Sequence, residues 1–156
     1  MNKNFTKEDI IKKHETNLKS AVTAFTLAGI LGFIYIIRYF IKGDFDFYFS
    51  LSVPEIMLKL SHAGEIGKGS AYAVVAVFVA VYIFLAVLNV KNQKWLKASL
   101  IFYGADFACL LGYIFLLMKG SVDSAAYIEV VVHFFVILFL SVGVYSEKKY
   151  KALKEN

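Results

Sequence analysis

Ionisable side chains inside apolar stretches are the residues of this sequence best suited to chemistry. Asp106 stands near the middle of the apolar run 97–119. Glu129 and His133 stand four residues apart in the next apolar run. Ionisable residues in a hydrocarbon environment are costly, and they mark ion paths, proton relays or ligand sites. These residue types therefore predict the binding or transfer of a proton or cation, or a buried polar site for a ligand.

Helical spacing gathers the polar side chains on two faces. In the run 97–119, steps of four, three and seven residues place four side chains on one stripe: Ser99, Tyr103, Asp106 and Tyr113. At about 1.5 Å per residue, Asp106 is expected near the membrane midplane, His133 about one turn further out and Glu129 near the outer surface. We therefore predict a ladder of these three groups with the two tyrosines beside it.

The same residues have a structural interpretation. Asp106 can be protonated or hydrogen-bonded to a serine or tyrosine of a neighbouring helix, while His133 is neutral and satisfied. Burial disfavours the charged form of a carboxyl group and a nearby imidazolium favours it, so the sequence leaves the charge state open. Glu129 also fits a residue of the membrane interface, because it lies close to the surface.

Histidine ligation of haem is a further possibility, since His62 and His133 could in principle face each other across a cofactor. Their spacing carries no haem signature, and His14 is expected on the opposite side of the membrane. Cys109 is the only cysteine, which excludes an internal disulfide and any CxxC motif. We therefore expect no cofactor and no metal.

Sequence motifs for catalysis or phosphate binding are missing. The segment 64–70, GEIGKGS, lacks Walker A spacing and follows no predicted strand. No serine has a partnered base at close spacing, and neither HExxH nor a paired-carboxylate motif occurs. The sequence therefore predicts a protein that is not an enzyme.

Composition indicates that most of the chain lies in lipid. The 156 residues are 59% hydrophobic and 17% aromatic, with a mean hydropathy of +0.63, whereas soluble domains are about 45–50% apolar. Within a membrane domain over 20–146, four runs of about twenty residues can each cross the ~30 Å hydrocarbon core: 21–40, 71–90, 98–118 and 125–145. Short turns make the last three antiparallel neighbours. The expected fold is an all-α integral membrane protein, an antiparallel four-helix transmembrane bundle with amphipathic helices on its surfaces.

Two further segments are expected to lie on the membrane surfaces. Segment 1–19 predicts an amphipathic helix that starts with a Thr6–Asp9 capping box, lies on the cytoplasmic side and then turns into the first span. The outer loop 42–69 predicts a short helix over 53–63 that lies flat over the end of the bundle. Its predicted N-cap, early-helix proline and capping-box acid are Ser52, Pro54 and Glu55.

The distribution of basic residues predicts the orientation. The chain has 17 Lys and Arg residues and a formal net charge of +5. Twelve of these residues fall in the amino-terminal segment, the turn 91–97 and the tail 147–156. The positive-inside rule places these segments, and both termini, in the cytoplasm. Because the basic residues flank the apolar runs, we expect contact with the lipid of the plasma membrane and no nucleic-acid partner.

Small residues at helical spacing predict close helix packing. They are Gly29 and Gly32 in the first span and Ala73, Ala76 and Ala80 in the second. We therefore expect a non-catalytic structural or accessory subunit that self-associates or packs in a larger membrane complex. The alternative is a small transporter or channel-like protein that uses Asp106 and His133.

Overall fold

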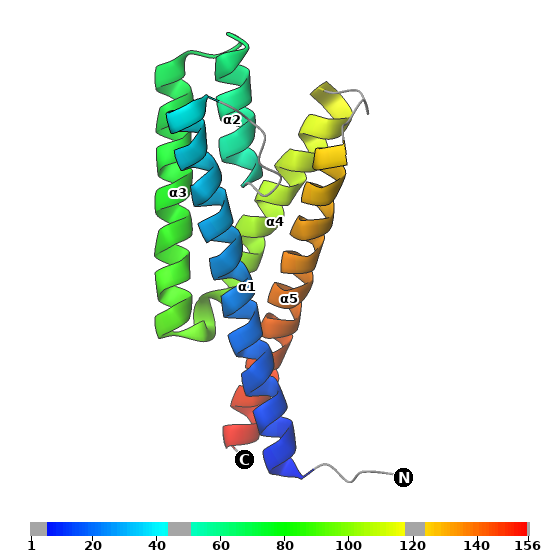
Figure 1. Ribbon diagram of the computed structural model, residues 1–156. Helices are drawn as coiled ribbons and strands as arrows, with labels where there is room; N and C mark the ends of the chain where they lie inside the picture. Colours follow the sequence, from blue (N-terminus) through cyan, green and yellow to red (C-terminus); the bar gives the residue numbers. More distant parts are fainter. Residues whose placement is uncertain (1–5, 44–50, 118–123, 156) are drawn as a thin grey trace.

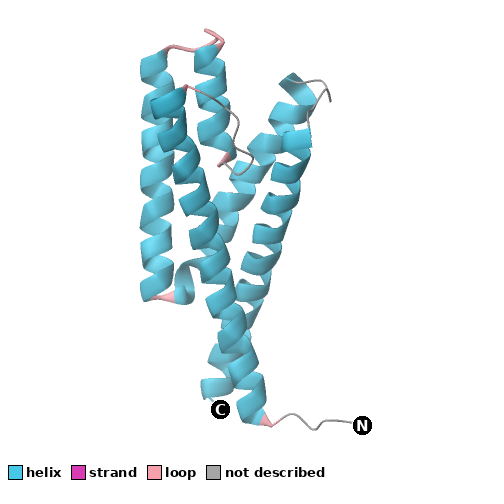
Figure 2. Cartoon of the chain, viewed as in Figure 1, coloured by secondary structure: helices cyan, strands magenta, loops and turns pink. Residues whose placement is uncertain are grey.

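The computed structural model describes residues 6–43, 51–117 and 124–155, and every element in these ranges is helical (Figures 1 and 2). In chain order the elements are α1 (Lys7–Lys42), α2 (Ser52–His62), α3 (Lys68–Lys91), the 3-10 turn η1 (Gln93–Trp95), α4 (Leu96–Gly112), the π-helical turn η2 (Tyr113–Leu117) and α5 (Ser124–Glu155). The all-α prediction is therefore confirmed for the described part of the chain.

Four helical segments are long and apolar enough to cross a membrane, as expected. They are Lys7–Lys42, Lys68–Lys91, Gln93–Leu116 and Ala126–Leu153. Only 22–33% of the residues in their most apolar windows are buried inside the structure, so most of these apolar side chains face outward. An outward apolar surface of this extent suits contact with lipid. The last residue of the third predicted span, Met118, lies outside the described residues.

The helix α1 is longer than expected and unbroken. Its first turn has the predicted capping box: the Asp9 N–H donates to Thr6 Oγ1 at 3.2 Å, and the Thr6 N–H donates to Asp9 Oδ2 at 3.1 Å. The helix then continues for 36 residues, so the prediction of a separate surface helix that turns into the first span is wrong. No glycine or proline precedes Gly29 in this helix, so no residue of the kind that ends helices interrupts it.

The helices α1 and α5 pack against each other, and Figure 1 shows them projecting together past the turn between α3 and α4. Ser146 of α5 is fully buried there and accepts a hydrogen bond from Asn17 Nδ2 at 3.1 Å. His14 Nδ1 lies 3.2 Å from the same hydroxyl. Further along, Gly143 leaves room for the Ala21 methyl group, which a side chain at position 143 would overlap. Small residues thus bring these two helices close.

The short helix α2 stands inside the bundle. Figure 1 shows it running alongside α3, between α3 and α4, in one half of the molecule. A helix on a surface buries a single stripe of residues. α2 instead buries most of its first turn: Ser52, Pro54, Glu55 and Ile56. The expectation of a helix lying flat over the end of the bundle is therefore wrong, because the N-terminal end of α2, its inner end, has partners deep in the structure.

Two hydrophobic clusters reflect this arrangement. The larger joins α1, α3, α4 and α5 around Phe25, Tyr82, Tyr103 and Leu140. The smaller joins α1, α2 and α3 around Tyr35, Leu58 and Val75. In the half of the molecule that contains α2 and the smaller cluster, α4 and α5 lean away from α1 and α3 (Figure 1). The short helix α2 therefore takes the place against α1 and α3 that α4 and α5 take in the other half.

Candidate functional site

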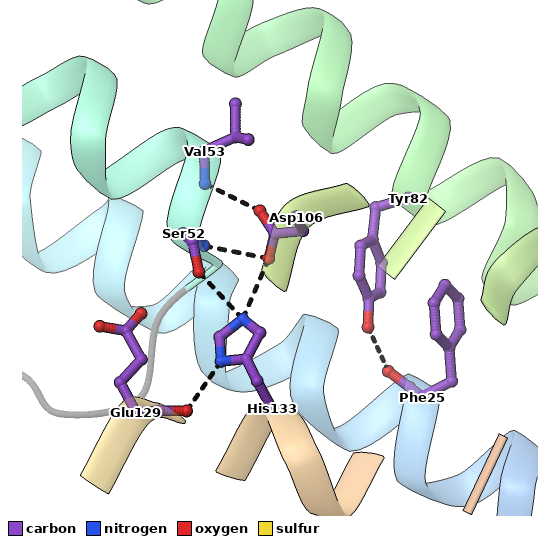
Figure 3. Close-up of polar contacts among 7 residues, drawn as sticks. All are labelled: Phe25, Ser52, Val53, Tyr82, Asp106, Glu129 and His133. Carbon is purple, nitrogen blue, oxygen red and sulfur yellow. Dashed lines mark hydrogen bonds and ion pairs between the residues drawn. The ribbon is translucent and has the colours of Figure 1, made fainter. Parts of the chain in front are cut away.

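The Asp106 carboxylate of α4 caps the buried N-terminus of α2 (Figure 3). The N-cap residue, Leu51, makes no side-chain cap hydrogen bond. Instead the Ser52 N–H donates to Asp106 Oδ2 at 3.1 Å, and the Val53 N–H donates to Oδ1 at 2.8 Å. Both carboxylate oxygens are thus bound by the backbone of α2. The carboxylate also lies at the positive end of the α2 dipole, which stabilises a negative charge.

This cap accounts for the backbone donors in the first turn of α2. The early N–H groups of a helix have no partner inside it, and burying one unpaired costs about 1–3 kcal/mol. Ser52 and Val53 donate to the carboxylate, and Pro54 has no N–H. The next N–H, of Glu55, donates to the N-cap carbonyl at 3.1 Å and begins the helical ladder. Every N–H from 52 to 55 is therefore satisfied, so this end of α2 can be buried.

His133 of α5 joins the same carboxylate. Its Nε2 lies 3.1 Å from Asp106 Oδ2 and 3.0 Å from Ser52 Oγ. Its Nδ1 lies 2.9 Å from the Glu129 backbone oxygen, which only accepts, so Nδ1 carries a proton and donates it. A proton held between Nε2 and the Asp106 carboxylate would keep their lone pairs from repelling each other. On either atom, that proton would leave the pair with no net charge, as burial favours.

Burial and aromatic rings enclose this pair. Asp106, His133 and Ser52 are each 1% exposed. The Tyr103 ring stacks on the imidazole with centroids 5.0 Å apart, and the Phe107 ring, one turn later on α4, stacks at 5.8 Å. The pair is therefore an enclosed polar contact among α2, α4 and α5.

The structure brings some residues of the predicted ladder together and separates the others. Asp106 and His133 meet directly, and Tyr103 lies beside them. Glu129 contributes its backbone oxygen, while its carboxylate points away from the imidazole in Figure 3. Tyr113 is half-buried at the start of η2 and has no hydrogen bond to the pair within the described residues. The bonded part of the ladder is thus the contact between two side chains.

The role of the α2 backbone has no local signature in the sequence. Ser52 is expected as the N-cap from its residue type, but it is the first helical residue. Glu55, expected as the capping-box acid, pairs with Lys59 at 2.5 Å. Burial acts to lower the pKa of Lys59, but the negative charge of the Glu55 carboxylate and its hydrogen bond together help to raise that pKa. Asp106 lies 54 residues from Ser52 in the chain, so no nearby pattern reveals this cap.

The arrangement differs from a catalytic triad, although a serine, a histidine and an aspartate meet. In a triad the serine and the carboxylate bind opposite nitrogens of the imidazole. Here both bind Nε2, and a backbone carbonyl holds Nδ1. Proton exchange between Nε2 and the Asp106 carboxylate is the chemistry that this geometry allows.

The positions of the histidines do not support the haem alternative. His62 is exposed at the far end of α2, about 15 Å along the helix from Ser52 at ~1.5 Å per residue. Both ring nitrogens of His133 have protein partners. Within the ranges 6–43, 51–117 and 124–155, no group of three or more His, Cys, Asp or Glu side chains could hold a metal ion.

The predicted small residues fall into two groups. The Tyr82 ring of α3 covers Gly29, and the Leu51 side chain covers Gly32. An apolar groove of about 280 Å³ lies beside these contacts, between α1 and α3. The alanines of the second span are exposed on α3: Ala73, Ala76 and Ala80. The glycines of α1 are therefore used inside the chain, and the alanines of α3 face outward.

Comparisons of the chain with protein-family models, with curated proteins and with solved structures find no match. The function is therefore inferred from the contacts of α2 and from the outward face of α3.

Proposed function

We propose that the chain is a multi-pass protein of the plasma membrane, an antiparallel bundle of four spans with both termini in the cytoplasm. The length and hydropathy of the four long helices support the crossings. The basic residues near both termini and in the turn 91–97 support the orientation. In this arrangement α2 reaches into the membrane from the outer side, and its N-terminus lies at the depth of Asp106. A helix end at that depth needs protein partners for its backbone groups, and the Asp106 carboxylate supplies them.

For its role we propose a non-catalytic structural or accessory subunit that packs against a second copy or another membrane subunit through α3. The observation that carries this proposal is the exposed alanine face of α3: Ala73, Ala76 and Ala80. Small residues let helices approach closely in lipid, where van der Waals packing drives association. The polar pair fits a structural role as well, because protein groups bind both oxygens of Asp106 and both ring nitrogens of His133.

Native mass spectrometry of the protein extracted gently from its own membranes tests this role. We expect a defined assembly in the wild type. Combining Ala76→Leu with Ala80→Leu should weaken that assembly by about tenfold or more, equivalent to about 1.4 kcal/mol. Ala105→Leu is the matched control, because Ala105 is an exposed alanine on α4. A monomeric wild type, or an assembly that survives in the double variant, would contradict the proposal.

A small transporter or channel-like protein is the second candidate. The observation that favours it is the position of the N-terminus of α2, which meets the Asp106 carboxylate and the His133 imidazole inside the bundle. Broken helices whose ends meet at the membrane midplane form the binding sites of many transporters. Reconstitution into proteoliposomes tests this function: Asp106→Asn should abolish ion or proton movement while the protein stays folded. Wild-type vesicles that move neither would rule this candidate out.

A further inference from the structure

We infer that Asp106 and His133 form a proton-binding site whose occupancy controls whether the inner end of α2 stays docked. In the docked state Nδ1 holds one proton, and a second is shared between Nε2 and Asp106 Oδ2. The pair is then neutral, and its carboxyl oxygens accept from the α2 backbone. This site is independent of association through α3, which involves a different face of the molecule.

One additional proton weakens both contacts. With protons on both Oδ2 and Nε2, the carboxylic acid has one strong acceptor left for the two N–H donors of Ser52 and Val53. The imidazolium of His133 loses its counter-charge and lies beside the positive end of the α2 dipole. A buried charge without its counter-charge is destabilising. Acid therefore favours release of the inner end of α2.

Loss of the shared proton has a smaller effect. The Asp106 carboxylate keeps both backbone donors, and the Ser52 hydroxyl, 3.0 Å away, can donate to the deprotonated Nε2. The inner end of α2 therefore stays docked in mild alkali. At its outer end α2 joins α3 through an exposed turn that contains Gly64, with φ 80. The inner end can thus move while the connection to α3 is kept.

The neighbouring titratable groups come from every element packed around the pair. Those within electrostatic reach of the carboxylate are Tyr82 of α3 and Tyr103 and Cys109 of α4. Glu55 of α2 and Glu129 of α5 lie further out. Tyr35 of α1 lies within electrostatic reach of both glutamates. Phenols and thiols are already protonated near pH 7 and take up nothing in mild acid. Glu55 and Glu129 also carry carboxyl groups, so variants of the pair itself are needed to assign a response to acid.

Hydrogen–deuterium exchange of the full chain in lipid nanodiscs tests this inference at pH 7.5 and pH 5. The measured quantity is the protection of the α2 amides divided by that of the α3 amides, after correction for intrinsic exchange rates. Exchange of this kind reports the free energy of local opening. We expect the ratio to fall by about tenfold or more at pH 5 in the wild type. An equal ratio at the two pH values would overturn the inference.

Three variants assign the response to this pair. Asp106→Asn mimics the protonated carboxyl group and should give a low ratio at both pH values. His133→Gln can still donate to the carboxylate but removes the imidazole that binds the second proton, so the ratio should change by much less than tenfold between the two pH values. His62→Gln removes an exposed histidine from α2 itself and should respond as the wild type does. A response to acid that persists in His133→Gln would contradict the assignment, and that result decides the question even if Asp106→Asn fails to fold.

Discussion

The neighbouring helices α1 and α3 both carry small residues at helical spacing, yet the chain uses the two sets differently. On α1, the Tyr82 ring covers Gly29 and the Leu51 side chain covers Gly32. On α3, the alanines are exposed: Ala73, Ala76 and Ala80. Both patterns predict close packing equally well. A small residue therefore marks where a large group can fit, and the rest of the fold decides which group fills the place.

The covered set has additional contacts that hold its partner in place. The Tyr82 hydroxyl donates to the Phe25 carbonyl at 2.5 Å, and the two rings stack with centroids 4.3 Å apart. Gly29 thus admits an aromatic ring whose hydroxyl is satisfied as well. The apolar face and the polar tip of this tyrosine both stabilise the contact between α1 and α3.

Gly32→Ala should have the largest effect on stability. The added methyl group would lie 2.5 Å from Leu51 Cγ and 3.2 Å from the Leu51 backbone nitrogen, so it would push the inner end of α2 away from Asp106. Overpacking of this kind costs about 1–3 kcal/mol, which a lower midpoint of thermal unfolding in detergent would reveal.

Gly104→Ala is the matched control for this substitution. A methyl group at Gly104 of α4 meets nothing within 4 Å, and replacing a helical glycine by alanine gains about 0.5–1 kcal/mol from conformational freedom alone. The two variants should therefore shift the unfolding midpoint in opposite directions. Equal shifts would show that Gly32 is not needed for close packing.

Tyr82→Phe should have an intermediate effect. It removes the hydrogen bond to Phe25 but keeps the stacked ring, so the expected loss is about 0.5–1.5 kcal/mol. Tyr72→Phe, at a residue 37% exposed on the same helix, controls for the loss of a hydroxyl as such and should change little. Denaturant unfolding of both variants measures the difference. A Tyr82→Phe protein as stable as Tyr72→Phe would mean that ring packing alone holds this contact.

Ala76→Leu should have the smallest effect on the stability of the single chain. Its side chain faces outward, and substitutions at such positions usually change stability by less than about 0.5 kcal/mol. The thermal midpoint of the isolated protein should therefore stay at the wild-type value, even where association is weakened. A large loss of stability would show that this face is packed within the chain, and the contrast with α1 would no longer hold.

Local patterns were sufficient for the long helices and for one buried face. Apolar runs predicted the four long helices, and the pairing of Thr6 with Asp9 predicted a helix start, which in the structure is the start of α1 and not of a separate surface helix. Three members of the predicted stripe, Ser99, Tyr103 and Asp106, are buried, whereas the fourth, Tyr113, is half-buried. The length of α1 and the packing role of Gly143 were missed, because a continuous helix pair depends on what α5 places beside α1.

By itself the sequence determined that the four apolar runs are helical and which face of α4 turns inward, because both depend on residues a few positions apart. Only the tertiary structure decided where α2 lies. Its first two N–H groups need an acceptor once they are buried, and that acceptor, Asp106, lies 54 residues from Ser52 along the chain. The tertiary structure also decided which small residues are covered, because a glycine or an alanine specifies an available space and not the side chain that occupies it.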